Sequence, residues 1–394
     1  MEVKQIYTLI NSVSDEVLGK TDIVKDDLTG VVDLGNEIFN QNAVDNYVKS
    51  LVNHIGKVVF VNRPYSGKVP SVLMDAWEFG SVLEKISADV PQAEENDTWN
   101  LENGTEYKQD VFHKPTVSAK FFNSKVTFEV PVSITERQIK ESFSSAAQLN
   151  GFLSMIYSAV EKSMTIKTDA LVMRTINNMI AETLNADKTA FGFVPSTRET
   201  VDYSSASTVR CVNLLKLYND KTKAHLTAAA AITTPDFIRF AAYIMGLYSD
   251  RLQTISTLFN IGGKERFTPK DVLHTVLLSD FAAAAKTYLY ADTFHEDNVL
   301  LPKAETVASW QATGEDYAFE HVSKIDVKSA GGADISVSGI LGVMFDRDAL
   351  GVTNLDRRVT TNYNAKAEFF NNYYKFDAGY FNDTNENFVV FFIS

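Results

Sequence analysis

The feature that most constrains the fold of this chain is a helical pattern of about 40 residues, several times longer than an average helix. Apolar residues recur every three to four positions along it. They are Phe152, Met155, Ile156, Ala159, Val160, Met164, Ala170, Met173, Ile176, Ile180 and Leu184, with Asn177 among them. The pattern is interrupted at most once, near Asn150 and Gly151. A helix of about 40 residues spans roughly 60 Å, so we expect a structural beam with a packed apolar stripe.

A strand pattern leads directly into this helix. Large apolar residues occupy even positions from Phe122 to Ile134, with polar residues between them. A period of two predicts a strand with one face in a core and the other against solvent or a neighbour. The run Thr135–Gln138 has the form of a capping box, which marks the start of a helix.

The regions before this strand are polar. The first forty residues predict an extended or loosely folded arm with weak helical patterning near residues 6–17, followed by a short helix near 43–55. Residues 58–61 predict a short strand. Residues 82–115 are acidic and rich in Asn and Gly, which predicts a solvated loop.

The remainder of the chain predicts a mixed α/β region that ends in strands. The expected helices cover 209–221, a segment that starts at Thr234-Pro235, and 280–289. The expected strands cover 272–279, 339–345 and two or three aromatic-rich runs within 359–393, with a turn at 330–333.

Charge and composition limit the classes of function. The net charge of −13 argues against a protein that grips nucleic acid through phosphate contacts. The single cysteine, Cys211, excludes an intrachain disulfide, fits a reducing cytoplasm and is expected to be a small buried residue. No apolar run is long enough for a membrane span, so no membrane contact is expected.

Motifs that carry chemistry are missing. The six histidines are scattered and lack the clustering of a zinc site. Gly262-Gly263-Lys264 is followed by Glu265 and does not form a phosphate-binding loop. We therefore expect no catalytic residues, no cofactor and no metal, and a protein that is not an enzyme.

Three segments resemble the major capsid proteins of tailed bacteriophages, in particular those of small Gram-positive podophages of the phi twenty-nine kind. They are DNYVKSLVNHIGKVV at 45–59, VSITERQIKESF at 132–143 with the helical run 149–169, and GILGVMFDRDA at 339–349. The order of expected elements also resembles theirs, and the resemblance covers most of the chain.

The resemblance implies an α+β protein with the Hong Kong 97-type capsid fold. Its parts would be an N-terminal arm and short helix (1–56), an extended loop with flanking strands (57–134), and a peripheral domain with a long spine helix (135–200). An axial domain (201–358) and C-terminal strands that return to the peripheral domain (359–394) would follow.

The implied function is that of a shell subunit that assembles as hexamers and pentamers into the icosahedral head around double-stranded DNA. The implied partners are copies of itself, a portal protein and packaged DNA bound without sequence specificity, in the virion capsid and, during assembly, the bacterial cytoplasm. About forty residues precede the short helix, too few for a fused scaffold-like domain, so a separate scaffolding protein is expected.

Charge suggests which residues meet between subunits. The acidic loop would reach over a neighbour and place carboxylates on basic residues near its spine helix. The candidate contact residues are Glu94, Glu95, Glu102 and Glu106 on the loop and Arg137, Lys140, Lys162 and Lys167 near the helix.

Three alternatives remain open at this stage. The same fold could form an encapsulin-type nanocompartment shell. The chain could also be an enzyme without a recognisable motif, or another structural phage protein such as a tail component. Electron microscopy of the purified protein would distinguish closed shells, tubes and small particles.

Overall fold

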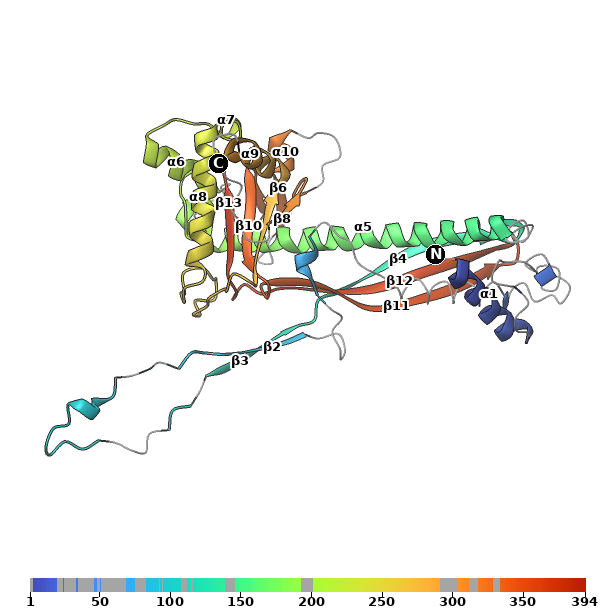
Figure 1. Cartoon of the computed structure of the whole chain (residues 1–394), viewed down its shortest axis with the longest axis horizontal. Coiled ribbons are helices and arrows are strands. Elements are labelled where there is room, and N and C mark those ends of the chain that lie inside the picture. Colours follow the sequence, from blue (N-terminus) through green and yellow to red (C-terminus); the bar gives the residue numbers. More distant parts are fainter. Residues whose placement is uncertain are drawn as a thin grey trace. The chain divides into compact units, whose positions relative to one another are not determined.

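The structure is a computed structural model that describes residues 3–19, 24, 33–34, 46–47, 50, 69–74, 83–91, 93, 95–107, 112–114, 116–138, 146–192, 201–290, 304–311, 318–328 and 334–394. The chain divides into two compact units. The first contains residues 1–78, 125–172 and 352–379, and the second contains 79–124, 173–351 and 380–394. Helices and strands are mixed, as expected for the α+β class (Figure 1).

The first unit begins with a helix instead of an extended arm. Helix α1 (Val3–Leu18) is amphipathic, and its residues Ile10 and Val13 are buried. The sequence signal at residues 6–17 was therefore a complete helix, and the expectation of a loosely folded arm was wrong there. Of the helix predicted at 43–55, the structure describes only 46–47 and 50, which are helical. The strand predicted at 58–61 lies outside the described residues.

A four-stranded sheet in the order β1-β11-β12-β4 belongs mainly to this unit. Its strands are β1 (Leu73–Met74, after the 3-10 turn Pro70–Val72), β4 (Lys125–Thr135), β11 (Leu350–Asn364) and β12 (Phe369–Asn382). Strands β4 and β12 pair antiparallel with Phe128 opposite Phe376, and the two rings lie 5.1 Å apart between centroids. The predicted alternation is confirmed, since Val126, Phe128 and Val132 are half-buried and the polar residues between them are exposed.

The capping box at the end of β4 is confirmed. The Gln138 amide N–H donates to Thr135 Oγ1 over 3.3 Å, and the Thr135 N–H donates to Gln138 Oε1 over 3.1 Å. These reciprocal bonds satisfy two donors that a helix start leaves free.

Helix α5 (Ala146–Ala186) confirms the predicted beam. It has 41 residues and continues through Asn150 and Gly151 without a break. Ile156, Val160 and Met164 are buried as predicted, and so are Ile176, Ile180 and Leu184 further along. The prediction was wrong for Met155, Ala159 and Ala170, which are exposed on the opposite side.

A five-stranded sheet in the order β5-β13-β10-β6-β7 forms the centre of the second unit. Its strands are β5 (Cys211–Asn213), β6 (Leu273–Leu278), β7 (Ala304–Val307), β10 (Ile340–Asp346) and β13 (Phe388–Phe392). The predicted strands at 272–279 and 339–345 are thereby confirmed, but residues 211–213, predicted to be helical, form β5. The last strand, β13, joins this sheet, whereas β11 and β12 join the four-stranded sheet.

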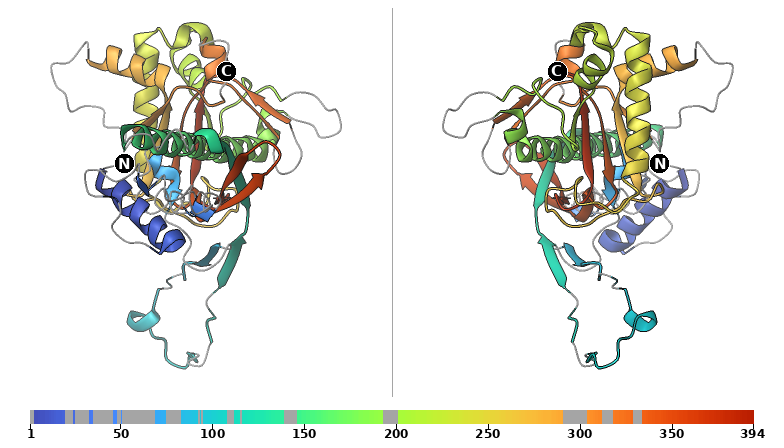
Figure 2. Two further views of the ribbon diagram at one scale, coloured as in Figure 1. Left: turned by 90° about the vertical axis from the view of Figure 1, so that its right-hand side faces the viewer. Right: turned by 90° about the vertical axis from the view of Figure 1, so that its left-hand side faces the viewer.

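Helices cover this sheet (Figure 2). They are α6 (Leu214–Thr222), α7 (Ala228–Ala231), α8 (Pro235–Arg251), α9 (Ser279–Tyr290) and α10 (Phe319–Val322), with a 3-10 turn at Lys188–Phe191. The predicted start of α8 is confirmed, although the Thr234 hydroxyl donates to the Ala230 carbonyl (2.8 Å) and does not cap the helix. A small sheet of β8 (Ile325–Lys328) and β9 (Asp334–Val337) flanks the turn predicted at 330–333, which lies outside the described residues.

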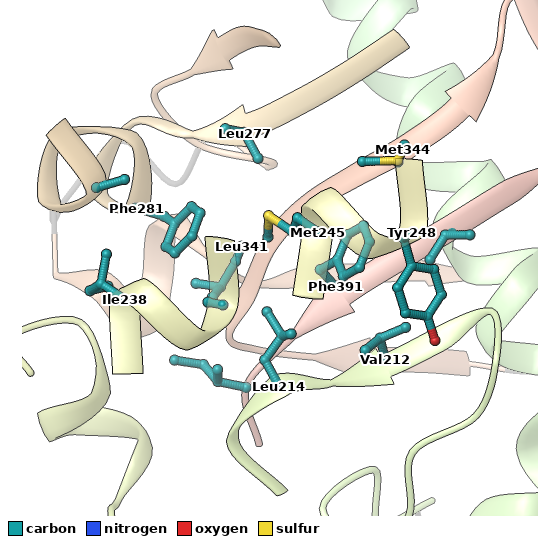
Figure 3. Packing of buried hydrophobic residues seen from close by; sticks show 14 of the residues in the cluster. Val212, Leu214, Ile238, Met245, Tyr248, Leu277, Phe281, Leu341, Met344 and Phe391 are labelled. Carbon is teal, nitrogen blue, oxygen red and sulfur yellow. The ribbon is translucent and has the colours of Figure 1, made fainter. Parts of the chain in front are cut away.

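The core of the second unit lies between α8, α9 and the sheet (Figure 3). Phe237, Met245 and Phe281 from the helices pack on Leu341 and Phe391 from the central strands, and all five are fully buried. This continuous apolar cluster gives the second unit a close-packed base.

The second unit also contains a hairpin that the sequence did not resolve into strands. Strand β2 (Leu83–Ala88) pairs antiparallel with β3 (Val117–Phe122), from Leu83 opposite Phe122 to Ala88 opposite Val117. Between them runs a loop that contains a 3-10 turn at Asp97–Trp99. Strands β2 and β3 and this loop, residues 83–122, are called the hairpin below (Figure 1).

Candidate assembly surfaces

The base of the hairpin carries two lysines directly opposite each other. Lys85 on β2 pairs in register with Lys120 on β3. Both are half-buried, as are their neighbours Ser87 and Ser118, whose hydroxyl oxygens lie 2.9 Å apart. Like charges in directly opposed positions destabilise a strand pair unless they are compensated.

The compensating charges come from the turn between β12 and β13. Lys120 Nζ donates to Asp383 Oδ1 over 2.8 Å, and Lys85 Nζ lies 3.1 Å from Asp383 Oδ2. Lys85 Nζ also donates to Glu386 Oε1 over 2.6 Å. A second loop contributes Lys264, whose Nζ donates to Ser118 Oγ over 2.7 Å. The base of the hairpin is thus held against the rest of the second unit by charged side chains.

These contacts shift the pKa values of the acids in opposite directions. Burial alone would raise the pKa of Asp383, but the hydrogen bonds from Lys120 and the Asn385 amide, with the charge of Lys85, hold it below its ordinary value. Burial raises the pKa of Glu386, although Lys85 opposes this. The Asp383 contacts therefore stabilise the fold above its unfolded-state pKa of 3.8 and are lost as the pH falls through the lowered value.

The far end of the hairpin exposes large apolar side chains. Trp99 is 94% exposed and Phe112 is 85% exposed, and Leu101 and Tyr107 are also exposed. The Tyr107 hydroxyl accepts a hydrogen bond from the Glu102 amide N–H over 3.0 Å. Exposed aromatic residues gathered on one protruding segment are typical of a protein-binding surface.

The comparisons with known proteins identify the family. The profile described as Phi29-like phage major capsid protein matches residues 9–392, nearly the whole chain. The chain belongs to this family. No curated protein sequence matches it.

Several solved capsid structures are similar to this capsid protein at low sequence identity. The capsid structure of Staphylococcus phage Andhra has 10% identity and a TM-score of 0.48, covering 84% of this chain and 86% of that one. The capsid structure of cyanophage P-SCSP1u has 11% identity and a TM-score of 0.44, covering 85% and 90%. A capsid of a native GTA particle has 10% identity and a TM-score of 0.42, covering 85% and 93%.

Family membership confirms the function expected from the resemblance, that of a major capsid protein of the virion. The order of elements is also the one implied by the Hong Kong 97-type fold: a hairpin, a strand that leads into a long helix, and a mixed α/β unit. The five-part division of the capsid chain stays a prediction.

The predicted contact residues of this capsid protein are exposed where the structure describes them. Glu95, Glu102 and Glu106 lie on the hairpin loop. Arg137 lies among the helical residues 136–138 that follow β4, and Lys162 and Lys167 lie on α5; all three are exposed. Glu94 and Lys140 lie outside the described residues. Because the structure contains one chain, it does not bring the two sets together, and their pairing stays a prediction.

The sequence missed that both surfaces also carry apolar residues. On α5, Met155 is 59% exposed and Ile166 is 66% exposed. At about 100° per residue, these two share one helix face with Lys162. Strand and helix periodicity cannot distinguish an apolar residue that packs in its own subunit from one that waits for a neighbour. The exposed Trp99 could have been suspected, since an aromatic residue in a polar loop has no core to enter.

The described residues contain no group of three or more His, Cys, Asp or Glu residues placed to hold a metal ion. Burial raises the pKa of Cys211 well above its ordinary value, which keeps its thiol protonated. Among the described helices, none is both long and apolar enough to cross a membrane.

Proposed function

We propose that this capsid protein is the repeating subunit of an icosahedral head around double-stranded DNA, and that the hairpin of each copy docks on helix α5 of a neighbour. Hexamers and pentamers of the chain would tile the shell. The role is structural, without catalytic activity.

The exposed end of the hairpin is the observation that carries this proposal. Trp99, Leu101 and Phe112 expose most of their surface, and burying such residues contributes about 25 cal/mol per Å². The exposed apolar positions on α5, Met155 and Ile166, offer a surface of the same character. Each contact is weak alone, but closed symmetry repeats it in every subunit.

Charge complementarity supports the same pair of surfaces. The hairpin loop carries Glu95, Glu102 and Glu106, and the helix carries Lys162 and Lys167. Opposite charges at the rim of an apolar contact favour one orientation over others. We extend this pairing to Glu94, Arg137 and Lys140 as part of the proposal.

The proposed partners follow from the task of closing a shell. A lattice of fixed curvature needs something that biases the angle between subunits, and a separate scaffolding protein in the host cytoplasm would supply it. A portal protein would occupy one vertex. The net charge of −13 would leave packaged DNA without strong phosphate contacts to the shell.

The test is to replace residues 94–106 by a Gly/Ser linker of the same length and to express the variant with the phage's own scaffolding protein. The second unit keeps its whole apolar cluster in this variant, so the subunit should fold with unchanged circular dichroism. Electron microscopy should show closed shells for the native chain and none for the variant. Normal shells from the linker variant would contradict the docking role.

A matched control replaces exposed residues away from both surfaces. Lys328→Ser and Asp334→Ser remove a pair on β8 and β9 that is 3.8 Å apart and largely exposed. This variant should still form shells. Small, uniform oligomers of the native chain in place of shells would contradict the capsid role itself.

A further inference from the structure

We propose that Asp383 is the positioning residue of the hairpin: its one carboxylate contacts both opposed lysines, Lys85 and Lys120, offsets their repulsion and thereby holds the hairpin base against the rest of the second unit. The inference concerns the single subunit. Only its consequence for shells rests on the proposed function.

The strand register brings two positive charges together. In this antiparallel pair, Lys85 and Lys120 stand directly opposite and point to the same half-buried side. Two ammonium groups in this position repel each other, and neither can turn to the solvent face without losing its ion pair. The hairpin therefore needs an anion between them.

The Asp383 carboxylate is this anion. Each of its carboxylate oxygens takes a different lysine, at 2.8 Å and 3.1 Å, and its side chain is only 3% exposed. Its own backbone is fixed, because the Asp383 N–H donates to the Ala349 carbonyl over 2.7 Å. The Asn385 N–H donates to Oδ1 over 3.1 Å and orients the carboxylate. Both groups that hold Asp383 lie outside the hairpin. The position of this carboxylate therefore determines where the hairpin base lies.

The surrounding charges cannot replace it. Glu386 contacts Lys85 at 2.6 Å but also lies 3.6 Å from Arg266 Nε. Lys120 pairs with Asp383 and not with Glu386. Lys264 adds a further positive charge, which Asp89 balances at 3.5 Å. Asp383 is thus the acid in the described part of the chain that joins both strands of the hairpin to the sheet.

Apolar contact at this end of the hairpin is small. The rings of Phe122 and Phe381 lie 5.0 Å apart, and Ile86 and Phe121 are exposed on the opposite side. A two-stranded hairpin is marginally stable alone. Loss of the charge contacts should therefore release it while the sheet of the second unit stays folded.

The test compares Asp383→Asn, Lys120→Gln and the double variant by amide hydrogen exchange of the unassembled subunit. Asp383→Asn keeps the shape of the side chain but restores the repulsion between the lysines. Protection of residues 83–88 and 117–122 should fall about tenfold to hundredfold. Protection of β6 and β10 should not change. Asp377→Asn is the control, since Asp377 pairs with Arg358 (2.7 Å) in the first unit.

Rescue of the Asp383→Asn variant by Lys120→Gln distinguishes this positioning role from a role of Asp383 in the β12–β13 turn alone. Lys120→Gln alone should leave the hairpin protected, because Lys85 still forms ion pairs with Asp383 and Glu386. Added to Asp383→Asn, it removes the repulsion and should restore at least part of the protection. Rescue that fails, or an Asp383→Asn protein with native protection, would overturn the proposal.

Every folding outcome is informative. If Asp383→Asn does not fold and the double variant does, the lysine repulsion is the cause and the proposal stands. If neither folds, Asp383 serves the turn alone and the proposal is wrong. If the hairpin is released as expected but shells still close normally, the positioning role holds and the docking function fails.

Discussion

Asn177 is a polar residue within the apolar stripe of α5, and its side chain explains its place there. Its Nδ2 donates to the Trp310 carbonyl over 2.7 Å, and Asn177 is buried. Trp310 is also buried and donates from Nε1 to the Ile340 carbonyl over 2.9 Å. The pair therefore connects the helix to the central sheet of the second unit through backbone groups that have no access to water.

We expect Asn177→Leu to lower the free energy of unfolding by about 1 to 3 kcal/mol, because it leaves the buried Trp310 carbonyl without this donor. Asn178→Leu is the matched control: Asn178 is half-buried, and the same substitution there should change stability by less than about 0.5 kcal/mol. Urea unfolding of the unassembled subunit measures both. Equal effects of the two substitutions would show that the hydrogen bond contributes nothing measurable.

Cys211 gives a probe of global unfolding without any substitution. It is fully buried in β5, with its Sγ 3.6 Å from the Thr183 carbonyl, and burial raises its pKa. Because the thiolate is the reactive form, we expect no labelling by a thiol reagent in the native subunit at pH 8. In urea, the labelling rate should follow the loss of near-ultraviolet circular dichroism. Rapid labelling without denaturant would mean that β5 opens locally.

At the scale of elements, strand β4 was visible in the sequence because its inward side chains are apolar. Of the inward positions of β2 and β3, only Leu83 and Phe122 at one end are apolar, and Lys85, Ser87, Ser118 and Lys120 are polar, so no apolar alternation marks these strands. Local periodicity reports which residues face an apolar core. It cannot report a face that packs on charged groups from a turn more than 260 residues away.

We expect Phe128→Asp to destabilise the first unit by about 2 to 4 kcal/mol. The half-buried ring packs on Phe376, which is itself buried, and the variant replaces this contact with a charge. Glu129→Ala is the control, since the Glu129–Lys375 pair is 3.3 Å apart on the surface and contributes less than about 1 kcal/mol. Thermal unfolding measures both. A Phe128→Asp protein of native stability that forms no shells would place this face between subunits.

For the whole molecule, the order of elements followed from the sequence and the resemblance, while the assembly surfaces followed only in part. Charges such as Glu102 and Lys162 were identified because exposed acids and bases are visible in composition. Met155 was assigned to the core, because an apolar residue in a periodic pattern is expected to be buried in its own chain. Trp99 and Ile166 were not singled out. Tertiary packing determines which apolar residues stay exposed in the single subunit and are free to contact a neighbouring subunit.

The last prediction tests the proposed pairing between copies by charge reversal. Lys162→Glu with Lys167→Glu should prevent or delay shell closure, because the acidic hairpin loop would then meet acids on the neighbouring α5. Glu102→Lys with Glu106→Lys should have the same effect from the other side. All four residues are exposed, so each subunit should fold normally.

Combining the four substitutions restores opposite charges with their signs exchanged, and shells should return. Light scattering gives the assembly rate at about 0.15 M salt, where contacts shorter than about 8 Å remain unscreened, and electron microscopy confirms closure. Recovery in the fourfold variant would require that the two sets of residues face each other, since two independent defects would add and not cancel. Two impaired pairs without recovery would show that both surfaces matter for assembly but that the hairpin loop docks on a different part of its neighbour.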